Sequence, residues 1–148
     1  MSELDQFYLK PDKDTLKEII VENEWDIVVA RQEGRELARQ IGFNEVDQAR
    51  ITTALSELAR NIVFYAGTGQ IKMWKGSSKG RASICIVAED NGPGIQDIKM
   101  ALQDGYSTAK GLGAGLPGVK RLVDHFFIKS KQGQGCVVAV EKILRRNL

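Results

Sequence analysis

The sequence predicts an α/β protein built as a two-layer α/β sandwich, with helices on one face of a mixed, mostly antiparallel sheet. Two observations lead to this fold class. Segments with a helical period interleave with strand-like segments along the 148 residues. The last strands come as hairpin pairs, and a hairpin makes neighbouring strands antiparallel. No internal repeat or linker interrupts the pattern, so we expect a flexible lead-in at residues 1–15 and a single domain at residues 16–148.

Composition and charge argue against several classes of protein. A hydrophobic content of 43% and a net charge of +2 are ordinary for a globular chain and give no reason to expect nucleic acid as a partner. The longest apolar runs have five residues, whereas a membrane span needs about 20. Cys85 and Cys136 fall in such runs, and the N-terminal segment is polar. We therefore expect reduced core thiols and a cytoplasmic location, without a membrane partner.

The first half of the chain predicts one strand and two helices. A short strand is expected over residues 16–22, and then a helix over residues 25–40 that ends at Gly42. Asn44 can cap a second helix, with Asp47 three residues further on. The apolar side chains of this helix recur with a period of 3.6 residues: Ile51, Ala54, Leu55, Leu58, Ile62 and Tyr65.

The second half predicts four strands and one short helix. Strands over residues 68–75 and 81–89 flank "KGSSKGR", which we interpret as a hairpin loop. A helix over residues 116–125 follows a glycine-rich stretch and places His125 near its end, where a structural role is expected. Strands over residues 127–131 and 136–143 complete the chain, joined by the turn "QGQG". For Trp25 and Trp74, the sequence leaves two interpretations open: a place in the core or a place on a surface that binds a partner.

Glu57 and Asn61 carry the first functional signal. Their i, i+4 spacing on the second predicted helix stacks them on one side, near the margin of the apolar stripe, while Arg60 points away from that stripe. An asparagine oxygen can ligate Mg²⁺, and a glutamate can act as a base or orient a water molecule. A solvated pair on the helix surface remains the alternative.

"EDNGPGI", at residues 89–95, carries the second signal. It directly follows an apolar strand, so Asp90 should emerge at the edge of the core. A carboxylate accepts hydrogen bonds from an exocyclic amine such as adenine N6. Gly92 and Gly94 flank a proline, make a tight turn and let a flat ring approach the backbone. An ordinary Asp/Asn/Gly/Pro turn is the alternative.

"GLGAGLPGVKRL", at residues 111–122, carries the third signal. Glycines before a helix can hold phosphate oxygens, because the free amides and the dipole of the helix face them. The stretch also fits G-x-G-x-x-G, but "DGYSTAK" before it is no strand, and no acidic residue follows about 20 positions on, as a dinucleotide fold needs. The sequence G-x-x-x-x-G-K-[ST] of a Walker A loop is absent as well.

The three motifs stand in an order that resembles the GHKL ATPase superfamily, which includes gyrase, heat-shock protein 90, histidine kinases and MutL. The resemblance implies a Bergerat-fold ATP site with Asn61 as Mg²⁺ ligand and Asp90 on the adenine amine. The segment at residues 96–111 is similar to the ATP lid of that family. Further nucleotide contacts follow from our interpretation of the turn and from the resemblance: Gly92, Gly94, Thr108, Gly111, Gly113 and Gly115. At position 136, this chain has cysteine where the family often has threonine. It stays open whether Cys136 makes the contact with adenine that the threonine usually makes.

Three stretches, at residues 24–62, 88–95 and 104–124, indicate one group within this superfamily. They resemble the RsbT-type switch kinases of bacterial stressosomes, relatives of anti-sigma-factor kinases, over about residues 17–144. The resemblance implies an ATP- and Mg²⁺-dependent serine/threonine kinase with Glu57 as general base. It implies STAS-domain scaffold proteins as substrates and, after release from them, binding and activation of a PP2C-type phosphatase. The alternative is a non-catalytic binding module whose nucleotide only sets its conformation.

Overall fold

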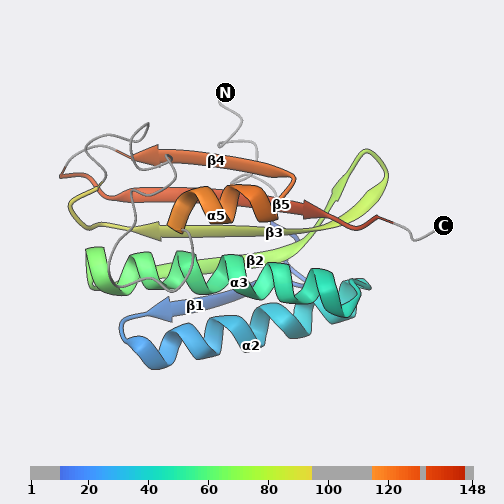
Figure 1. Cartoon of the computed structure of the whole chain (residues 1–148), viewed down its shortest axis with the longest axis horizontal. Helices are drawn as coiled ribbons and strands as arrows, with labels where there is room; N and C mark the ends of the chain where they lie inside the picture. The colour runs from blue at the N-terminus through green and yellow to red at the C-terminus, as the bar shows by residue number, and fades with distance from the viewer. Residues whose placement is uncertain (1–10, 95–114, 131–132, 146–148) are drawn as a thin grey trace.

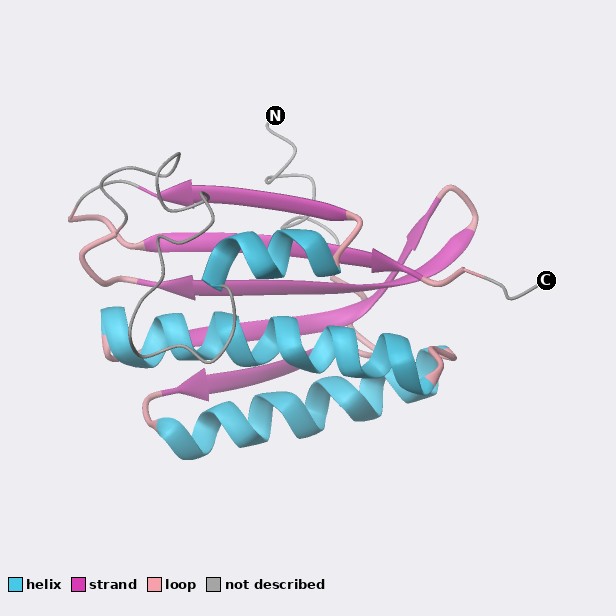
Figure 2. Cartoon of the chain, viewed as in Figure 1, coloured by secondary structure: helices cyan, strands magenta, loops and turns pink. Residues whose placement is uncertain are grey.

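A computed structural model places, within the residues that it describes, a five-stranded sheet behind three α-helices (Figure 1). It describes residues 11–94, 115–130 and 133–145, so Thr108, Gly111, Gly113 and the predicted lid lie outside the described residues. Figure 2 shows the two layers, with all helices of the described part on one face of the sheet. The predicted two-layer α/β sandwich is confirmed. In chain order the elements are β1 (Lys17–Val21), α2 (Glu24–Ile41), α3 (Glu45–Asn61), the π-helix η1 (Ile62–Ala66), β2 (Gly69–Ser78), β3 (Arg81–Asp90), α5 (Gly115–Leu122), β4 (His125–Ser130) and β5 (Cys136–Ile143).

The sheet differs from the prediction in being antiparallel rather than mixed in its described pairs. The strand order is β1-β2-β3-β5-β4, and each neighbouring pair is antiparallel. β3 and β4 run in the same direction, and α5 lies between them in the sequence. β5 lies between them, however, so these two strands do not exchange hydrogen bonds.

Polar side chains fix where the two long helices begin. Asn23 caps α2, because its side chain accepts from the Asp26 amide at 3.2 Å while the Asp26 carboxylate accepts from the Asn23 amide, also at 3.2 Å. Asn44 caps α3 by accepting from the Asp47 amide at 2.8 Å, as predicted. Gly42 ends α2 at φ +116, a left-handed conformation that glycine adopts without strain. The sequence thus determines both helix starts and the turn between the helices.

Three predicted boundaries were wrong: the end of the strand over residues 68–75, the end of the helix over residues 116–125 and the start of the strand over residues 127–131. Because β2 continues to Ser78, which pairs with Arg81, the loop of the β2–β3 hairpin has only two residues, Lys79 and Gly80. Both loop residues have positive φ, the pattern of a tight type I′ turn. The predicted helix over residues 116–125 ends at Leu122, and His125 begins β4.

The second predicted helix also changes character before its end. α3 stops at Asn61, and η1 continues with a wider turn in which the Gly67 amide donates to the Ile62 carbonyl at 2.8 Å. The wider turn rotates the following side chains, which leaves Tyr65 exposed instead of on the buried stripe where the period placed it.

The main core lies between the helices and the sheet. Along β3, Ile84, Ile86 and Ala88 face it, whereas Cys85 and Val87 belong to a smaller cluster of strand residues that includes Trp74. This alternation is the period of two expected for a strand with two different faces. Trp74 is therefore a core residue, whereas Trp25 is exposed. No helix in the described ranges has the length and apolarity to cross a membrane.

Candidate nucleotide site

Among the described residues, those that the motifs singled out belong to segments that meet at one end of the molecule. The C-terminal end of α3, the end of β3, the beginning of α5 and the beginning of β5 meet there, on the left in Figure 1. These segments are far apart in the sequence, and antiparallel pairing brings them together: Asp90, the last residue of β3, lies opposite Cys136, the first residue of β5. Glu57 and Asn61 belong to α3, and Asp90 belongs to β3.

Glu57 lies deeper than its predicted place at the margin of the core. The residue is only 4% exposed, although α3 is otherwise buried mainly through apolar side chains. Its Oε1 accepts from Nη1 of Arg60 at 3.1 Å. A buried carboxylate without a partner would be strongly destabilising, so this ion pair compensates the charge. Sequence reasoning treated Arg60 as a residue that points away, and missed this contact.

Asn61 is the last residue of α3 and lies one helical turn beyond Glu57. It is half-buried, and within the part of the chain that the structure describes, no hydrogen bond engages its side-chain amide. The π-helix begins directly after it. Single wide turns of this kind are rare and are often found at functional sites. The amide oxygen of Asn61 is therefore available to a ligand at this end of the helix.

Asp90 is half-buried at the end of β3, as predicted. Its Oδ1 accepts from the Gly92 amide at 2.9 Å. Burial raises the pKa of the Asp90 carboxyl above its usual value, although the backbone hydrogen bonds from Gly92 and Cys136 oppose this shift. A carboxylate that is costly to keep ionised gains from a further donor, and an exocyclic amine is such a donor.

The structure gives a reason for glycine at position 92 that differs from the expected one, which was the approach of a flat ring. A Cβ at position 92 would lie 2.6 Å from the Cβ of Ala66 and 2.7 Å from its Cα, so the turn packs against η1. Gly69 makes a similar contact, since a Cβ there would lie 2.5 Å from the Glu89 carbonyl oxygen and 2.8 Å from Cγ2 of Ile62. Gly92 therefore lets the turn after β3 approach η1 closely, and Gly69 lets β2 approach both β3 and η1.

Gly135, in the β4–β5 turn, packs against the turn after β3. Gly135 has φ +84, and a Cβ there would meet the backbone carbonyl of Asp90. Beside it, the Gly133 amide donates to the Pro93 carbonyl at 2.6 Å. The β4–β5 turn therefore holds the turn that carries Asp90. Sequence reasoning saw glycines at 69 and 135 but had no signal for what they contact.

The remaining predicted residues divide into two groups. Gly94 and Gly115 have left-handed φ values of +74 and +67, and Gly115 is the first residue of α5. Both lie in segments that the structure describes, and neither has a side chain to fill space beside a ligand. Thr108, Gly111 and Gly113 lie outside the described residues.

Cys136 is half-buried beside Asp90. Burial raises the pKa of its thiol to about 11, with the charge of Asp90 contributing and a hydrogen bond with Ser130 opposing. The thiol is therefore protonated at neutral pH. A protonated thiol is a weak hydrogen-bond donor, so it does not match the donor strength of a threonine hydroxyl.

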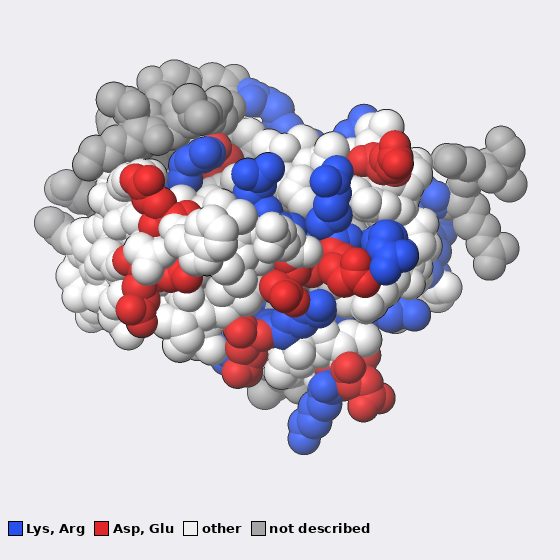
Figure 3. Space-filling model, turned by 90° about the horizontal axis from the view of Figure 1, so that it is seen from below, with Lys and Arg blue, Asp and Glu red and all other residues white. Residues whose placement is uncertain are grey.

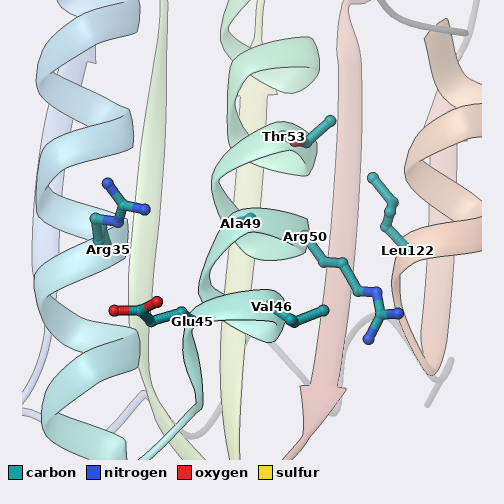
Figure 4. Close-up of a pocket in the computed structure, with 7 residues that line it drawn as sticks. All are labelled: Arg35, Glu45, Val46, Ala49, Arg50, Thr53 and Leu122. Atoms are coloured by element: carbon teal, nitrogen blue, oxygen red, sulfur yellow. The ribbon is translucent and has the colours of Figure 1, made fainter.

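A shallow, open pocket lies elsewhere on the helical layer. It follows the first half of α3, between α2 and α5 (Figure 4), and none of the predicted nucleotide residues lines it. Its lining residues are Arg35, Glu45, Val46, Ala49, Arg50, Thr53 and Leu122. On the face shown in Figure 3, basic and acidic side chains are interspersed, as a net charge near zero suggests.

The described residues fit a nucleotide with magnesium. Asn61 offers a neutral amide oxygen, which is a ligand type that Mg²⁺ accepts together with phosphate oxygens. Asp90 offers an acceptor whose ionised form gains from a donor. Gly92 holds that acceptor in place, because its amide donates to Asp90 and its Cα packs against Ala66. These features together favour an adenine end near Asp90 and a phosphate end near Asn61.

Comparisons with known proteins place the chain among nucleotide-binding enzymes. Residues 46–146 match the family model described as "Histidine kinase-, DNA gyrase B-, and HSP90-like ATPase". The serine/threonine-protein kinase RsbT of Bacillus subtilis (strain 168) is 57% identical over 122 residues, which cover 82% of this chain and 92% of that protein. An anti-sigma F factor of Clostridium kluyveri is 33% identical over 98 residues, which cover 63% of this chain and 68% of that protein.

One solved structure is also similar. The catalytic domain of the histidine kinase ThkA, in a nucleotide-free form, aligns with 17% sequence identity over 86% of this chain and 95% of that chain, at a TM-score of 0.48.

The matched family region runs from α3 to β5 and contains Glu57, Asn61 and Asp90. The predicted resemblance to GHKL ATPases and to RsbT is confirmed: the chain belongs to the family of histidine kinase-, DNA gyrase B- and HSP90-like ATPases.

Proposed function

We propose that this chain is an ATP- and Mg²⁺-dependent serine/threonine protein kinase of a bacterial stress-signalling pathway. The observation that carries the proposal is Glu57, a buried carboxylate one helical turn before the open amide of Asn61. A site that only bound a nucleotide would gain little from a buried acid there, because burying a carboxylate costs free energy. The 57% identity to the serine/threonine-protein kinase RsbT supports the same activity.

The proposed roles divide the site into a binding part and a reacting part. Asp90 accepts from the adenine amine, and Asn61 supplies an oxygen to the magnesium ion. Bound Mg-ATP supplies the γ-phosphoryl group and the positive charge that neutralises it. Gly92, Gly94, Thr108, Gly111, Gly113 and Gly115 are proposed to surround the nucleotide without side-chain bulk, apart from the hydroxyl of Thr108.

Glu57 acts as the general base in this proposal. Its carboxylate orients the hydroxyl of a serine or threonine on the protein substrate and accepts the proton as the oxygen forms its bond to phosphorus. The O–H bond breaks, the new O–P bond forms and ADP leaves. A positioned base of this kind contributes about 10²- to 10⁴-fold to the rate.

The substrates and partners form the finer part of the proposal. We expect STAS-domain scaffold proteins of a stressosome as phosphoacceptors and a PP2C-type phosphatase as the protein that is activated after release. The similarity to RsbT and to an anti-sigma F factor supports partner switching of this kind. Such a cycle belongs in the cytoplasm.

The test is phosphate transfer from γ-labelled ATP to purified STAS-domain proteins in the presence and absence of Mg²⁺. We expect label on a serine or threonine of the STAS protein, identified by mass spectrometry, and no transfer after chelation of the metal. Binding of the STAS protein without transfer, by a chain that binds ATP normally, would support the non-catalytic binding module instead.

A further inference from the structure

Arg60 holds the carboxylate of Glu57 at the end of α3. Nη1 of Arg60 lies 3.1 Å from Oε1 of Glu57, three residues apart on the helix. The side chain of Glu57 is 5% exposed and that of Arg60 is 23% exposed. The pair is thus mostly shielded from water, where an ion pair is screened little and fixes the geometry of both groups.

Arg60 and Asn61 both lie about one helical turn after Glu57, on different sides of it. At about 100° per residue, Arg60 lies to one side of Glu57 and Asn61 to the other. Arg60 contacts Oε1, and across the described ranges no hydrogen bond to Oε2 is found. One carboxylate oxygen is therefore held, while the other is left for a further partner.

We propose that Arg60 is a positioning residue for phosphoryl transfer, which holds Glu57 through Oε1 so that Oε2 receives the proton of the acceptor hydroxyl. This inference rests on the proposed role of Glu57 as general base. Arg60 keeps the buried charge compensated before the reaction and restricts the rotamers of the glutamate. Its effect on the rate is therefore exerted through Glu57, without contact to the substrate.

The chain contains a matched control for this ion pair. Glu36 and Arg39 on α2 have the same residue types at the same spacing, and Nη2 of Arg39 lies 2.7 Å from Oε1 of Glu36. Their side chains are 43% and 64% exposed. Such an exposed pair contributes little to stability and lies on a different helix from the site. The two pairs share residue types and spacing but differ in burial, in place and in geometry, because Arg39 donates to both carboxylate oxygens of Glu36 whereas Arg60 donates to Oε1 of Glu57.

The first experiment compares Arg60→Met, Arg60→Lys and Arg39→Met in the full chain, with γ-labelled ATP and the STAS-domain protein that the wild-type chain phosphorylates. We expect Arg60→Met to lower kcat on the order of 10²-fold, the scale of a displaced catalytic group, with KM for ATP unchanged. Arg60→Lys should recover part of the loss, because lysine restores the charge but not the planar donor group. Arg39→Met should match the wild type.

The second experiment needs no protein substrate. Thermal unfolding should show a lower Tm for Arg60→Met, by roughly 10 °C, because Glu57 remains buried without a partner. Adding Glu57→Gln should restore most of that loss, because the amide carries no charge. In the transfer assay the double variant should be no slower than Glu57→Gln alone, as expected for two residues that act as one unit.

Two results would overturn the inference. One is a normal or increased kcat for folded Arg60→Met while Glu57→Gln has lost transfer, which would make the arginine dispensable or inhibitory. The other is a Tm loss that Glu57→Gln does not reduce. If Glu57→Gln itself transfers phosphate at the wild-type rate, the general-base proposal fails first, and the Tm measurement still decides whether Arg60 serves to compensate Glu57.

Discussion

Gly92 packs against Ala66 so closely that a Cβ at position 92 would lie 2.6 Å from the Ala66 Cβ. This contact joins the turn that carries Asp90 to the π-helix that follows Asn61. In the proposed site, a nucleotide spans from Asp90 to Asn61 and needs a fixed distance between these two segments. The packing of backbone on backbone sets that distance more rigidly than side-chain contacts would, because backbone atoms cannot change rotamer.

Gly92→Ala should therefore weaken both the fold and nucleotide binding. The added methyl group meets Ala66 backbone and side chain, and overpacking of this kind costs about 1–3 kcal/mol of unfolding free energy. Because the turn must shift to admit it, the affinity for Mg-ATP should fall as well. Thermal unfolding and calorimetry measure the two effects.

Gly80→Ala is the control for this variant. Gly80 has φ +79, and a Cβ there would meet nothing within 4 Å, so only the conformational strain of the hairpin turn is tested. It should lower stability without changing ATP affinity. Equal ATP affinity for Gly92→Ala and the wild type would show that the contact with Ala66 does not set the site.

Asp90→Asn should weaken ATP binding by about 1.5–3 kcal/mol, the scale for a hydrogen bond to a charged group. The adenine amine would lose its carboxylate acceptor and could face an amide donor. Calorimetric titration with ATP measures the loss, and circular dichroism verifies the fold. Unchanged affinity in a folded variant would contradict the adenine assignment.

Asp90 also predicts a pH dependence of binding. Burial raises the pKa of its carboxyl, so the carboxylate takes up a proton earlier than usual as the pH falls from 7. ATP affinity should then decrease toward the raised pKa, and Asp90→Asn should lack this component. The same shift affects stability with the opposite sign: the contribution of Asp90 is present below the unfolded pKa and is lost as the pH rises through the folded pKa.

Glu57→Gln and Asn61→Ala should separate chemistry from binding. Glu57→Gln keeps the size of the side chain but removes the base, so phosphate transfer should fall by about 10²- to 10⁴-fold, while binding of ATP and of the phosphatase survives. Asn61→Ala should lose Mg-dependent nucleotide binding as well. Transfer assays and partner binding are measured on each variant. Loss of partner binding by a folded Glu57→Gln would place Glu57 in the interface.

Both cysteines should resist thiol reagents in the native protein. Burial raises the pKa of Cys85 to about 12, with the charge of Glu141 adding to it, and raises that of Cys136 to about 11. Since the thiolate is the reactive form, a disulfide reagent at pH 8 should react slowly with the folded chain and rapidly in guanidinium. Fast reaction of one thiol in the native state, assigned with Cys85→Ser and Cys136→Ser, would contradict this expectation.

Local sequence signals predicted which helices and strands form better than they predicted where these elements end. Asn44 and Gly42 marked a helix start and a helix end correctly, because capping depends on atoms within a few residues. The end of the helix after Leu122 depended on distant atoms instead. The Asp124 amide donates to the Glu141 carbonyl at 2.9 Å, and the Asp124 carboxylate accepts from the Ile143 amide at 2.7 Å. These bonds draw the chain into the sheet before His125.

The sequence by itself determined the chemistry available to this protein. The types and order of Glu57, Asn61, Asp90 and the glycines indicated an ATP site, and the family match supports it. Tertiary structure decided which of these groups are buried, which are held and what they touch. Arg60 turned out to hold Glu57, and Gly92 to pack on Ala66. The physical reason is that burial and close approach depend on contacts between segments distant in the sequence, which a local pattern of residues does not contain.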